Sequence, residues 1–428
     1  MGFWRRLFVD RFVVEGGVPL HGMVETSGAK NSALPVLAAC LLTSDPVELH
    51  RIPAVKDIRT MMDLMVHMGA SVVDSGDDTV TVSAGGAIEP EAPYEVVKTM
   101  RASSLVLGPL VGRFGRARVS LPGGCAIGAR PIDLHMRGLE QLGAKIEQTH
   151  GYIEATAPGG LRGATVHFDR ITVTGTEDIL MAAVLAQGET LIENAAREPE
   201  VVDLADLLSK MGAEIAGAGT STIRVRGVKE LKGVRHTIIA DRIEAGTFAI
   251  AAAITGGDVS ITRCVPDHLT ALNAKLRQAG AEVTVTGPES LHIQSDGKLH
   301  SVDMVTEEHP GFPTDLQAQY MSLMTQADGI AIVSERIFEN RFMHAPELAR
   351  MGASIRIDGR QAIVAGPRRL TGAHVMASDL RASASLVLAG LVAEGETIVD
   401  RVYHMDRGYA KIESKLAGLG ARIRRVRG

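Results

Sequence analysis

Several side chains that could do chemistry lie where loops should expose them. Cys125 lies in Pro122–Pro131, whose three glycines and two prolines predict a flexible loop rather than a core strand. A thiol in such a loop, with Arg130 nearby to lower its pKa, can react. Cys40, in an apolar stretch, and Cys264, at the end of a predicted strand, are interpreted as buried core residues.

Charged residues at predicted helix starts form a second set. Lys30 and Asn31 shortly precede Pro35, and because proline is tolerated in the first turn of a helix, we expect a helix to begin here. Asp315 follows Pro313-Thr314 and precedes a helical stretch, which predicts a helix cap or a first-turn carboxylate. Free N–H groups and the helix dipole make such positions suitable for binding anions.

Four arginines are candidates for clamping an anionic ligand: Arg101, Arg130, Arg381 and Arg407. Guanidinium groups bind phosphate and carboxylate through paired hydrogen bonds, which an ammonium group cannot match. Arg101 and Arg381 both begin an Arg-Ala-Ser sequence, in different halves of the chain. The sequence therefore predicts ligands that carry phosphate or carboxylate groups.

The elements that must position these residues recur along the chain. A helix-like stretch ends in an apolar residue, Gly and Ala six times, with the glycines at Gly69, Gly143, Gly212, Gly280, Gly352 and Gly420. Successive glycines are 68 to 74 residues apart, so six such units fill the chain. Each glycine should take the left-handed conformation that ends a helix, and a strand-like run follows. The pattern predicts a compact α/β unit of two helices and several strands, used six times.

The 428 residues suggest two or three domains. A net charge of −5 and an aromatic content of 4% disfavour a nucleic-acid-binding protein. Three cysteines without a CxxC spacing disfavour a disulfide framework or a zinc site. This cysteine content is typical of a protein of the reducing cytoplasm. Charges interrupt Met1–Phe8 and every apolar stretch, so neither a signal peptide nor a membrane span is expected. No P-loop or zincin motif occurs.

Several long motifs spread along the chain resemble the UDP-N-acetylglucosamine 1-carboxyvinyltransferase family of enolpyruvyl transferases. The resemblance runs from about residue 10 to the C-terminus, and it is carried by Ser27–Asn31, Lys98–Ser103, Leu121–Pro131, Glu193–Glu200, Phe312–Asp315, Phe338–Phe342 and Asp406–Tyr409. It implies two inside-out α/β barrel domains, each of three units, which agrees with the six repeats. Residues 30–239 should form the first domain, and residues 1–29 with 240–428 the second, with substrates bound between them.

The resemblance also implies the reaction and its residues. The enolpyruvyl group of phosphoenolpyruvate should pass to the 3′-hydroxyl of UDP-N-acetylglucosamine, without a metal or other cofactor. The implied catalytic residues are Cys125 as general acid, Asp315 as base, Lys30 and Arg407. The implied substrate-binding residues are Lys30, Asn31, Arg101, Arg130, Pro131, Ile132, Asp133, Leu134, Arg170, Ile171, Thr172, Val173, Asp315, Ile337, Arg381 and Arg407.

Two positions depart from the pattern of some family members. Thr174 replaces a glycine beside the expected diphosphate contact, and Leu105 replaces a tryptophan. Cys125 further implies inhibition by the epoxide fosfomycin, which alkylates this thiol in the family. A monomer is the expected state, since the family is commonly monomeric.

Two alternatives remain open from the sequence. The sister enolpyruvyl transferase that acts on shikimate 3-phosphate has the same fold and chemistry, but it lacks Cys125 and the Ala29-Lys30-Asn31 run. A paralogue without activity could bind the nucleotide sugar alone. Since decayed sites normally lose a polar residue, the complete set of expected positions disfavours the second alternative.

Overall fold

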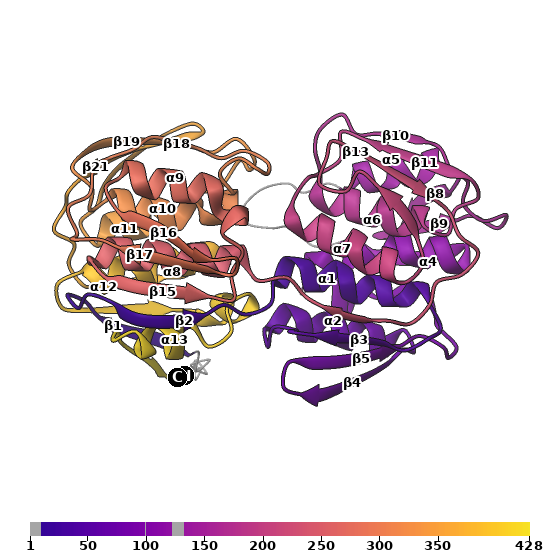
Figure 1. The fold of residues 1–428 in the computed structure, drawn as a ribbon, viewed down its shortest axis with the longest axis horizontal. Coiled ribbons are helices and arrows are strands. Elements are labelled where there is room, and N and C mark those ends of the chain that lie inside the picture. Colours follow the sequence, from indigo (N-terminus) through magenta and orange to yellow (C-terminus); the bar gives the residue numbers. More distant parts are fainter. Residues whose placement is uncertain (1–9, 99, 122–131) are drawn as a thin grey trace, which may run out of the picture. The chain divides into compact units, whose positions relative to one another are not determined.

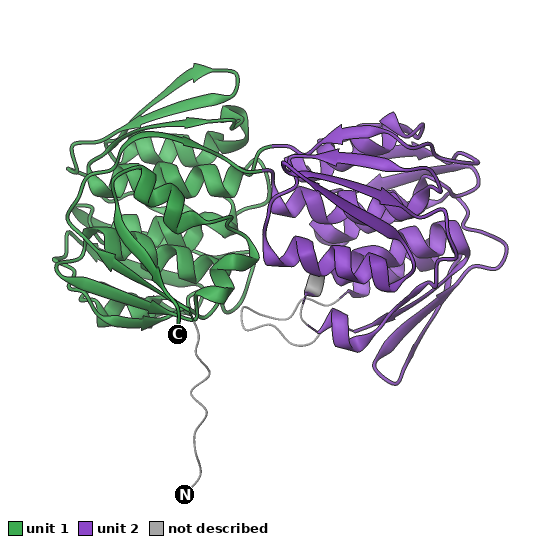
Figure 2. Cartoon of the chain, turned by 90° about the horizontal axis from the view of Figure 1, so that it is seen from below, with its two compact units in different colours: residues 1–27, 126–129, 240–428 green, residues 28–125, 130–239 purple. Residues whose placement is uncertain are grey.

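The computed structural model describes residues 10–98, 100–121 and 132–428, which divide into two compact units (Figure 2). Unit 1 holds the described residues 10–27 and 240–428, and unit 2 holds the described residues 28–98, 100–121 and 132–239. Three four-stranded sheets belong to each unit. No helix in the described ranges has both the length and the apolar character needed to span a bilayer.

The elements of unit 2 carry the labels of Figure 1. Its strands are β3 (Val47–His50), β4 (Ser71–Gly76), β5 (Thr79–Ser83), β6 (Glu91–Ala92), β7 (Arg116–Ser120), β8 (Lys145–Thr149), β9 (Tyr152–Thr156), β10 (Thr165–His167), β11 (Glu189–Glu193), β12 (Glu214–Ala216), β13 (Thr222–Arg226) and β14 (Arg235–Thr237). Its helices are α1 (Lys30–Ala39), η1 (Cys40–Leu42), α2 (Lys56–His67), α3 (Tyr94–Val97), η2 (Arg101–Val106), α4 (Leu107–Phe114), α5 (Asp133–Gln141), α6 (Val173–Ala183) and α7 (Pro199–Lys210).

Unit 1 contains the remaining elements. Its strands are β1 (Arg11–Glu15), β2 (His21–Glu25), β15 (Asp258–Thr262), β16 (Glu282–Gly287), β17 (Ser290–Gln294), β18 (Met304–Val305), β19 (Gly329–Ser334), β20 (Ser354–Asp358), β21 (Gln361–Gly366), β22 (His374–Met376), β23 (Glu396–Asp400) and β24 (Arg422–Val426). Its helices are α8 (Arg242–Thr255), η3 (Pro266–Leu269), α9 (Thr270–Gln278), η4 (Thr314–Leu316), α10 (Gln317–Met324), α11 (Ala345–Arg350), α12 (Leu380–Val392), η5 (Val402–Arg407) and α13 (Ile412–Gly418).

All six sheets have the same spatial arrangement of parallel and antiparallel strands, and four of them also share the chain connections described next. In the sheet of order β6-β7-β9-β8, the edge strand β6 is parallel to β7, whereas β9 pairs antiparallel with both β7 and β8. A buried helix, here α4, connects the two parallel strands, and an outer helix, here α5, precedes the final hairpin. This is the predicted α/β unit of two helices and several strands.

Three sheets are completed by strands from distant parts of the sequence, and in one of them, in unit 1, β2 is parallel to β15. Strand β1 lies between β23 and β24 and pairs antiparallel with both, so the start of the described chain completes the last repeat. Strand β14 is parallel to β3 and completes the first sheet of unit 2. Each unit is therefore closed by residues that only the folded chain brings together.

The inner helices form the centre of each unit, with the sheets around them (Figure 1). In unit 1, α8, α10 and α12 contact one another, and residues Arg242–Ile254 of α8 are all buried. Small residues permit this close packing: a Cβ atom on Gly246 would lie 2.5 Å from Cδ1 of Leu316. The alanine- and glycine-rich stretches of the sequence are thus the helices that pack on one another.

The outer helices end as the repeat predicts. All six repeat glycines have a positive φ, between 92° at Gly143 and 109° at Gly212. The alanine that follows each glycine donates its N–H to the carbonyl five residues earlier, as in Ala70 to Met65 at 2.9 Å and Ala421 to Leu416 at 3.0 Å. This is the Schellman motif, which satisfies the last carbonyl groups of a helix. The predicted helix ends are therefore confirmed.

Candidate active site

A buried cluster of charges in unit 1 is centred on Asp315. Nη2 of Arg341 donates to Oδ1 of Asp315, and Nη2 of Arg381 donates to Oδ2, both at 2.8 Å. The carboxylate side chain is 25% exposed, whereas the side chains of Arg341 and Arg381 are only 4% and 5% exposed. A partly accessible carboxylate is thus held between two buried guanidinium groups.

The N-termini of the inner helices bring these groups together. Asp315 lies in η4, directly before α10, and Arg381 is the second residue of α12. Asp379 caps α12 by accepting from the N–H groups of Arg381 and Ala382, at 2.8 and 3.0 Å. Asp241, the N-cap of α8, stabilises the charge of Arg381. Three helix N-termini therefore converge in unit 1, as expected for an anion-binding surface.

The electrostatics keep Asp315 ionised. Burial favours the neutral acid, but the positive charges of Arg381 and Arg341 outweigh it and hold the pKa of Asp315 well below its usual range. Burial disfavours the charged form of Arg381, yet Asp315 raises the pKa of this guanidinium above its usual value. Within the described part of the chain, one buried Nη1 atom on each arginine has no hydrogen-bond partner.

A buried hydrogen-bond network lies behind this cluster. The hydroxyl groups of Tyr409 and Thr247 are 2.8 Å apart, and Nε2 of Gln319 donates to both. The same Nε2 donates to the backbone carbonyl of Asp315 at 3.1 Å. The guanidinium of Arg381 lies 5.4 Å from the centre of the Tyr409 ring. The network fixes both the main chain of Asp315 and the side chain of Arg381.

Glu335 connects Asp315 with the loop that holds Ile337. Its buried carboxylate accepts from the N–H groups of Ile337 and Phe338 at 2.8 and 3.1 Å. It also accepts from the hydroxyl groups of Thr306 at 2.9 Å and Thr314 at 2.8 Å. The predicted nucleotide contact and the predicted base are thus joined through one side chain.

Arg407 lies on a different element from Asp315. It ends η5, two residues before Tyr409, and it is half-buried. The preceding Asp406 accepts from Nη1 of Arg425 at 3.0 Å and also from Nη2. Nε of Arg425 donates to Glu413 at 2.8 Å. Strand β24 therefore holds the short helix that carries Arg407.

In unit 2, Lys30 begins α1, as predicted. Its Nζ atom lies 2.8 Å from Oδ2 of Asp57, a buried residue in the first turn of α2. Asn31 is the next helical residue. The expectation that Pro35 lies in the first turn was wrong, because Pro35 is the sixth residue of the helix. There it removes the N–H group that would bond to the carbonyl of Asn31.

The two segments expected to bind the nucleotide lie side by side in unit 2. Ile132, Asp133 and Leu134 begin α5, and Arg170, Ile171, Thr172 and Val173 lead into α6. Nη2 of Arg170 lies 3.8 Å from Oδ1 of Asp133. Thr172 caps α6 by accepting from Gly175, at 3.2 Å.

Thr174 is one of the two residues that differ from the pattern of some family members. Its hydroxyl lies 3.1 Å from Nε2 of His135, and this contact joins the first turns of α5 and α6. Burial lowers the pKa of His135 to about 4, although Asp133 opposes the shift. The ring is therefore neutral at neutral pH. Leu105, the other departure, is buried in the core.

Some predicted residues lie outside the described structure. These are Cys125, Arg130 and Pro131. Arg101 begins η2, and only its backbone is described. Cys40 and Cys264 are buried, and burial raises their thiol pKa to about 12 and about 11, which confirms their assignment to the core.

The sequence did not identify three residues that support Asp315: Arg341, Glu335 and Tyr409. Arg341 and Tyr409 lie in motifs that carried the family resemblance, Phe338–Phe342 and Asp406–Tyr409. The motifs could have marked these two residues as candidates. Neither spacing nor residue type, however, reveals that Arg341 contacts Asp315, which lies 26 residues earlier in the sequence. No comparable signal pointed to Glu335.

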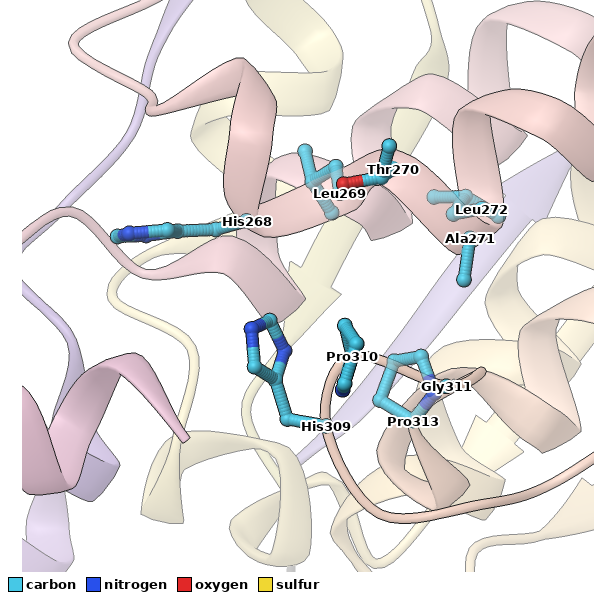
Figure 3. Close-up of a pocket in the computed structure, with 9 residues that line it drawn as sticks. All are labelled: His268, Leu269, Thr270, Ala271, Leu272, His309, Pro310, Gly311 and Pro313. Atoms are coloured by element: carbon cyan, nitrogen blue, oxygen red, sulfur yellow. The ribbon is translucent and has the colours of Figure 1, made fainter. Parts of the chain in front are cut away.

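A shallow pocket lies on unit 1 near the turn that holds Asp315 (Figure 3). It is lined by His268, Leu269, Thr270, Ala271, Leu272, His309, Pro310, Gly311 and Pro313. None of these described residues was predicted to bind substrate, so the pocket does not enter the candidate site. The described ranges also contain no group of three or more His, Cys, Asp or Glu arranged to hold a metal ion.

The fold and its repeats match known proteins. The sequence profile of the EPSP synthase (3-phosphoshikimate 1-carboxyvinyltransferase) family matches residues 14–416. The enolpyruvyl transferase NikO from Streptomyces tendae has a TM-score of 0.88 at 28% identity, covering 98% of this chain and 100% of NikO. EPSP synthase from Acinetobacter baumannii has a TM-score of 0.76 at 18% identity, covering 98% and 100%, which shows a shared fold alone. The predicted fold class is confirmed, and it is that of the enolpyruvyl transferases.

Relatives of higher sequence identity show which family of enolpyruvyl transferases the chain belongs to. UDP-N-acetylglucosamine 1-carboxyvinyltransferase from Solibacter usitatus is 72% identical, covering 98% of this chain and 100% of that protein. Enzymes of the same name from Acidobacterium capsulatum and Myxococcus xanthus are 62% and 58% identical, covering 98% and 97% of this chain and 96% and 99% of their own length. The chain belongs to the UDP-N-acetylglucosamine 1-carboxyvinyltransferase family, as its motifs predicted.

Proposed function

We propose that this protein transfers the enolpyruvyl group of phosphoenolpyruvate to the 3′-hydroxyl of UDP-N-acetylglucosamine and releases phosphate. The reaction is the first committed step of peptidoglycan precursor synthesis. Identity of 72% with an enzyme of that name, over nearly the whole of both chains, carries the proposal. The charge cluster on Asp315 supports it, because the reaction needs an ionised base beside cationic groups.

The reaction proceeds by addition and elimination. Asp315 accepts the proton of the sugar hydroxyl, whose oxygen bonds to the phosphate-bearing carbon of phosphoenolpyruvate. Cys125 donates a proton to the methylene carbon. The C–O bond to phosphate then breaks, the methyl carbon loses a proton, and the double bond forms again. A carboxylate that is ionised and partly accessible suits the first step.

The cations have separate roles in the proposal. Lys30, Arg130 and Arg407 bind phosphoenolpyruvate, and Asn31 contacts the intermediate. Arg101 lines the substrate cleft, and Arg381 contributes to the closure of the enzyme on its bound substrates. The segments Ile132–Leu134 with Pro131, Arg170–Val173, and Ile337 bind the nucleotide sugar. The helix N-termini that carry Lys30 and Arg381 support these assignments, since a helix N-terminus favours anionic ligands.

Shikimate 3-phosphate as the acceptor is not favoured. The EPSP synthase structure from Acinetobacter baumannii has 18% identity to this chain, whereas enzymes named for the UDP-sugar reaction have 58% to 72%. The complete set of polar side chains around Asp315 also disfavours a paralogue without activity.

The decisive experiment measures phosphate release from phosphoenolpyruvate with and without UDP-N-acetylglucosamine. We expect release only with the nucleotide sugar, and loss of activity as fosfomycin alkylates Cys125. Cys125→Asp is the matched variant, because it keeps a proton donor without a thiol and should remain active with fosfomycin. Release with shikimate 3-phosphate instead would support the sister enzyme, and no release with either acceptor would contradict transferase activity.

We further propose that the enzyme acts as a cytoplasmic monomer without a cofactor. Sedimentation equilibrium should give a mass close to 45.4 kDa. A dimer mass at micromolar concentration would contradict the proposed monomer. Undiminished activity after dialysis against EDTA is expected for a reaction that uses no metal.

A further inference from the structure

A buried polar cluster joins the start of α1 to α7 and β14. Ser32, in the first turn of α1, donates its hydroxyl hydrogen to Oδ2 of Asp203 in α7. Nε2 of His236 in β14 lies 3.0 Å from Oδ1 of the same carboxylate. The N–H group of Ile239 donates to Oδ2 at 3.4 Å. One carboxylate thus receives hydrogen bonds from three segments, and the three side chains involved are buried.

The geometry of this cluster excludes a nucleophilic triad. Asp203 lies between the hydroxyl and the imidazole, so His236 has no contact through which it could act as a base on Ser32. The ammonium group of Lys210 lies 3.3 Å from Nδ1 of His236. Because an ammonium group only donates, Nδ1 accepts and Nε2 carries the hydrogen that bonds to Asp203. The imidazole of His236 therefore acts as a structural donor to Asp203.

The first turn of α1 needs such support. Its N-cap residue, Ala29, has no side chain that could accept a hydrogen bond, and Pro35 removes one bond within the helix. The backbone of Ala29 is held from outside the helix, because its N–H group donates to the carbonyl of Ile239 at 2.7 Å. Ile239 also donates to Asp203, so the same cluster holds both the residue before α1 and its third residue.

We propose that Ser32, Asp203 and His236 are positioning residues that set the first turn of α1 and thereby place Lys30 for phosphoenolpyruvate and Asn31 for the intermediate. The inference rests on the proposed function, in which these two residues make those contacts. Asp57 fixes the ammonium end of Lys30 at 2.8 Å, and the cluster fixes its main chain. Both ends of the lysine are thus held by buried carboxylates from other helices.

Ser32→Ala tests the proposal, with Thr43→Val as the matched control. Thr43 follows η1 at the opposite end of the same helical segment, it is also buried, and its hydroxyl donates to the carbonyl of Leu231 at 2.7 Å. We expect Ser32→Ala to raise the KM for phosphoenolpyruvate roughly tenfold. The KM for UDP-N-acetylglucosamine should stay within about twofold, since its proposed contacts lie elsewhere. Thr43→Val should lower Tm without changing either KM. Equal effects of the two variants on the KM for phosphoenolpyruvate would overturn the proposal.

A second pair of variants tests the donor at His236. His236→Gln keeps an N–H group that can reach Asp203, whereas His236→Leu removes it. The glutamine variant should retain the wild-type KM for phosphoenolpyruvate, and the leucine variant should behave like Ser32→Ala. Retention of the wild-type KM by the leucine variant would contradict a role for this hydrogen bond.

Amide hydrogen exchange separates this inference from the proposed function. Peptides that cover residues 28–34 should exchange faster in Ser32→Ala than in Thr43→Val or wild type, because the first turn loses its anchor. This readout does not require turnover. A wild-type enzyme that releases no phosphate would refute the proposed function alone, whereas unchanged exchange in Ser32→Ala would refute the positioning role alone.

Discussion

At the scale of single residues, Asp315 shows how position and charge act on one side chain. A helix-start aspartate is common, and the sequence predicted this much from Pro313-Thr314. The two arginines that bind it come from 26 and 66 residues further along the chain. The packing of α10 against α12 brings Arg381 to Asp315, and the turn before α11 brings Arg341, each to 2.8 Å. The sequence therefore identified Asp315 and Arg381 as candidate site residues but not the contact between them, and it did not identify Arg341, since these contacts are not local.

Replacing Arg341 should weaken catalysis without unfolding the protein. Arg341→Gln removes one of the two cations on Asp315, so we expect kcat/KM to fall roughly 30- to 100-fold, or about 2–3 kcal/mol. The pKa of Asp315 should rise toward its usual value, so the acid limb of the pH–rate profile should move to higher pH. Steady-state kinetics from about pH 3 to pH 9 measure both effects, since the usual pKa of an aspartate lies near 3.8.

Arg369→Gln is the control for this prediction. Arg369 lies in the same unit, is 78% exposed and pairs with Glu394 on the surface. Such exposed pairs contribute little, so its kinetics should match the wild type. An unshifted acid limb in Arg341→Gln would show that the guanidinium does not control the ionisation of Asp315.

At the scale of elements, the repeat was predictable because its signals are local. A glycine after an amphipathic stretch ends a helix through its own backbone conformation, and all six positions behave this way. The closing strands were not predictable on this basis. Strand β1 pairs with residues 396–400 and 422–426, and no local pattern specifies partners so distant in sequence.

Two glycines at the end of α13 separate backbone strain from helix propensity. Gly420 has a φ of 99°, whereas Gly418 lies in the helix, and a Cβ atom would meet no atom within 4 Å at either site. Gly420→Ala should therefore lower the free energy of unfolding by about 1 kcal/mol. Gly418→Ala should raise it by about 0.5–1 kcal/mol. Urea denaturation measures both, and equal signs would contradict the strain argument.

Glu335 offers a test of how two loops are coupled. Glu335→Gln keeps an oxygen for Ile337, Phe338 and Thr306, and the hydroxyl of Thr314 can accept from the new amide. We expect near-wild-type activity. Glu335→Ala leaves these buried donors without an acceptor and should cost about 2–3 kcal/mol of stability. Thermal unfolding and steady-state kinetics of both variants provide the comparison.

At the scale of the whole molecule, each unit contains a buried histidine with a depressed pKa. Burial lowers the pKa to about 4 for His135 in unit 2 and for His344 in unit 1. The unfolded chain binds these protons near pH 6.5, so the stability they contribute is present above about 6.5 and is lost as the pH falls toward 4. The ionised carboxylate of Asp315 also contributes to folding stability. This contribution is lost only as the pH falls below 3.8, the usual pKa of an aspartate.

The two histidines should therefore lower the free energy of unfolding below neutral pH, whereas Glu177 and Asp178, whose pKa burial raises well above the usual range, should oppose this change. Each histidine should cost the folded state about 1.4 kcal/mol per pH unit between about 6.5 and 4. Urea denaturation at pH 7, 6 and 5 measures the slope. His135→Asn and His344→Asn should each flatten it, since asparagine does not titrate. A slope unchanged in both variants would show that other groups dominate.

The placement of β1 has a consequence for how the chain is made. On a ribosome, Arg11–Glu15 emerges first, and its neighbours β23 and β24 emerge about four hundred residues later. Unit 2 consists of described residues that all lie between 28 and 239. It can therefore fold while unit 1 still lacks most of its sequence. The earliest strand must then wait, unpaired, until the last one leaves the exit tunnel. Unit 1 therefore cannot complete its sheet with β1 until the last strand has been made, whereas unit 2 needs no residue beyond 239.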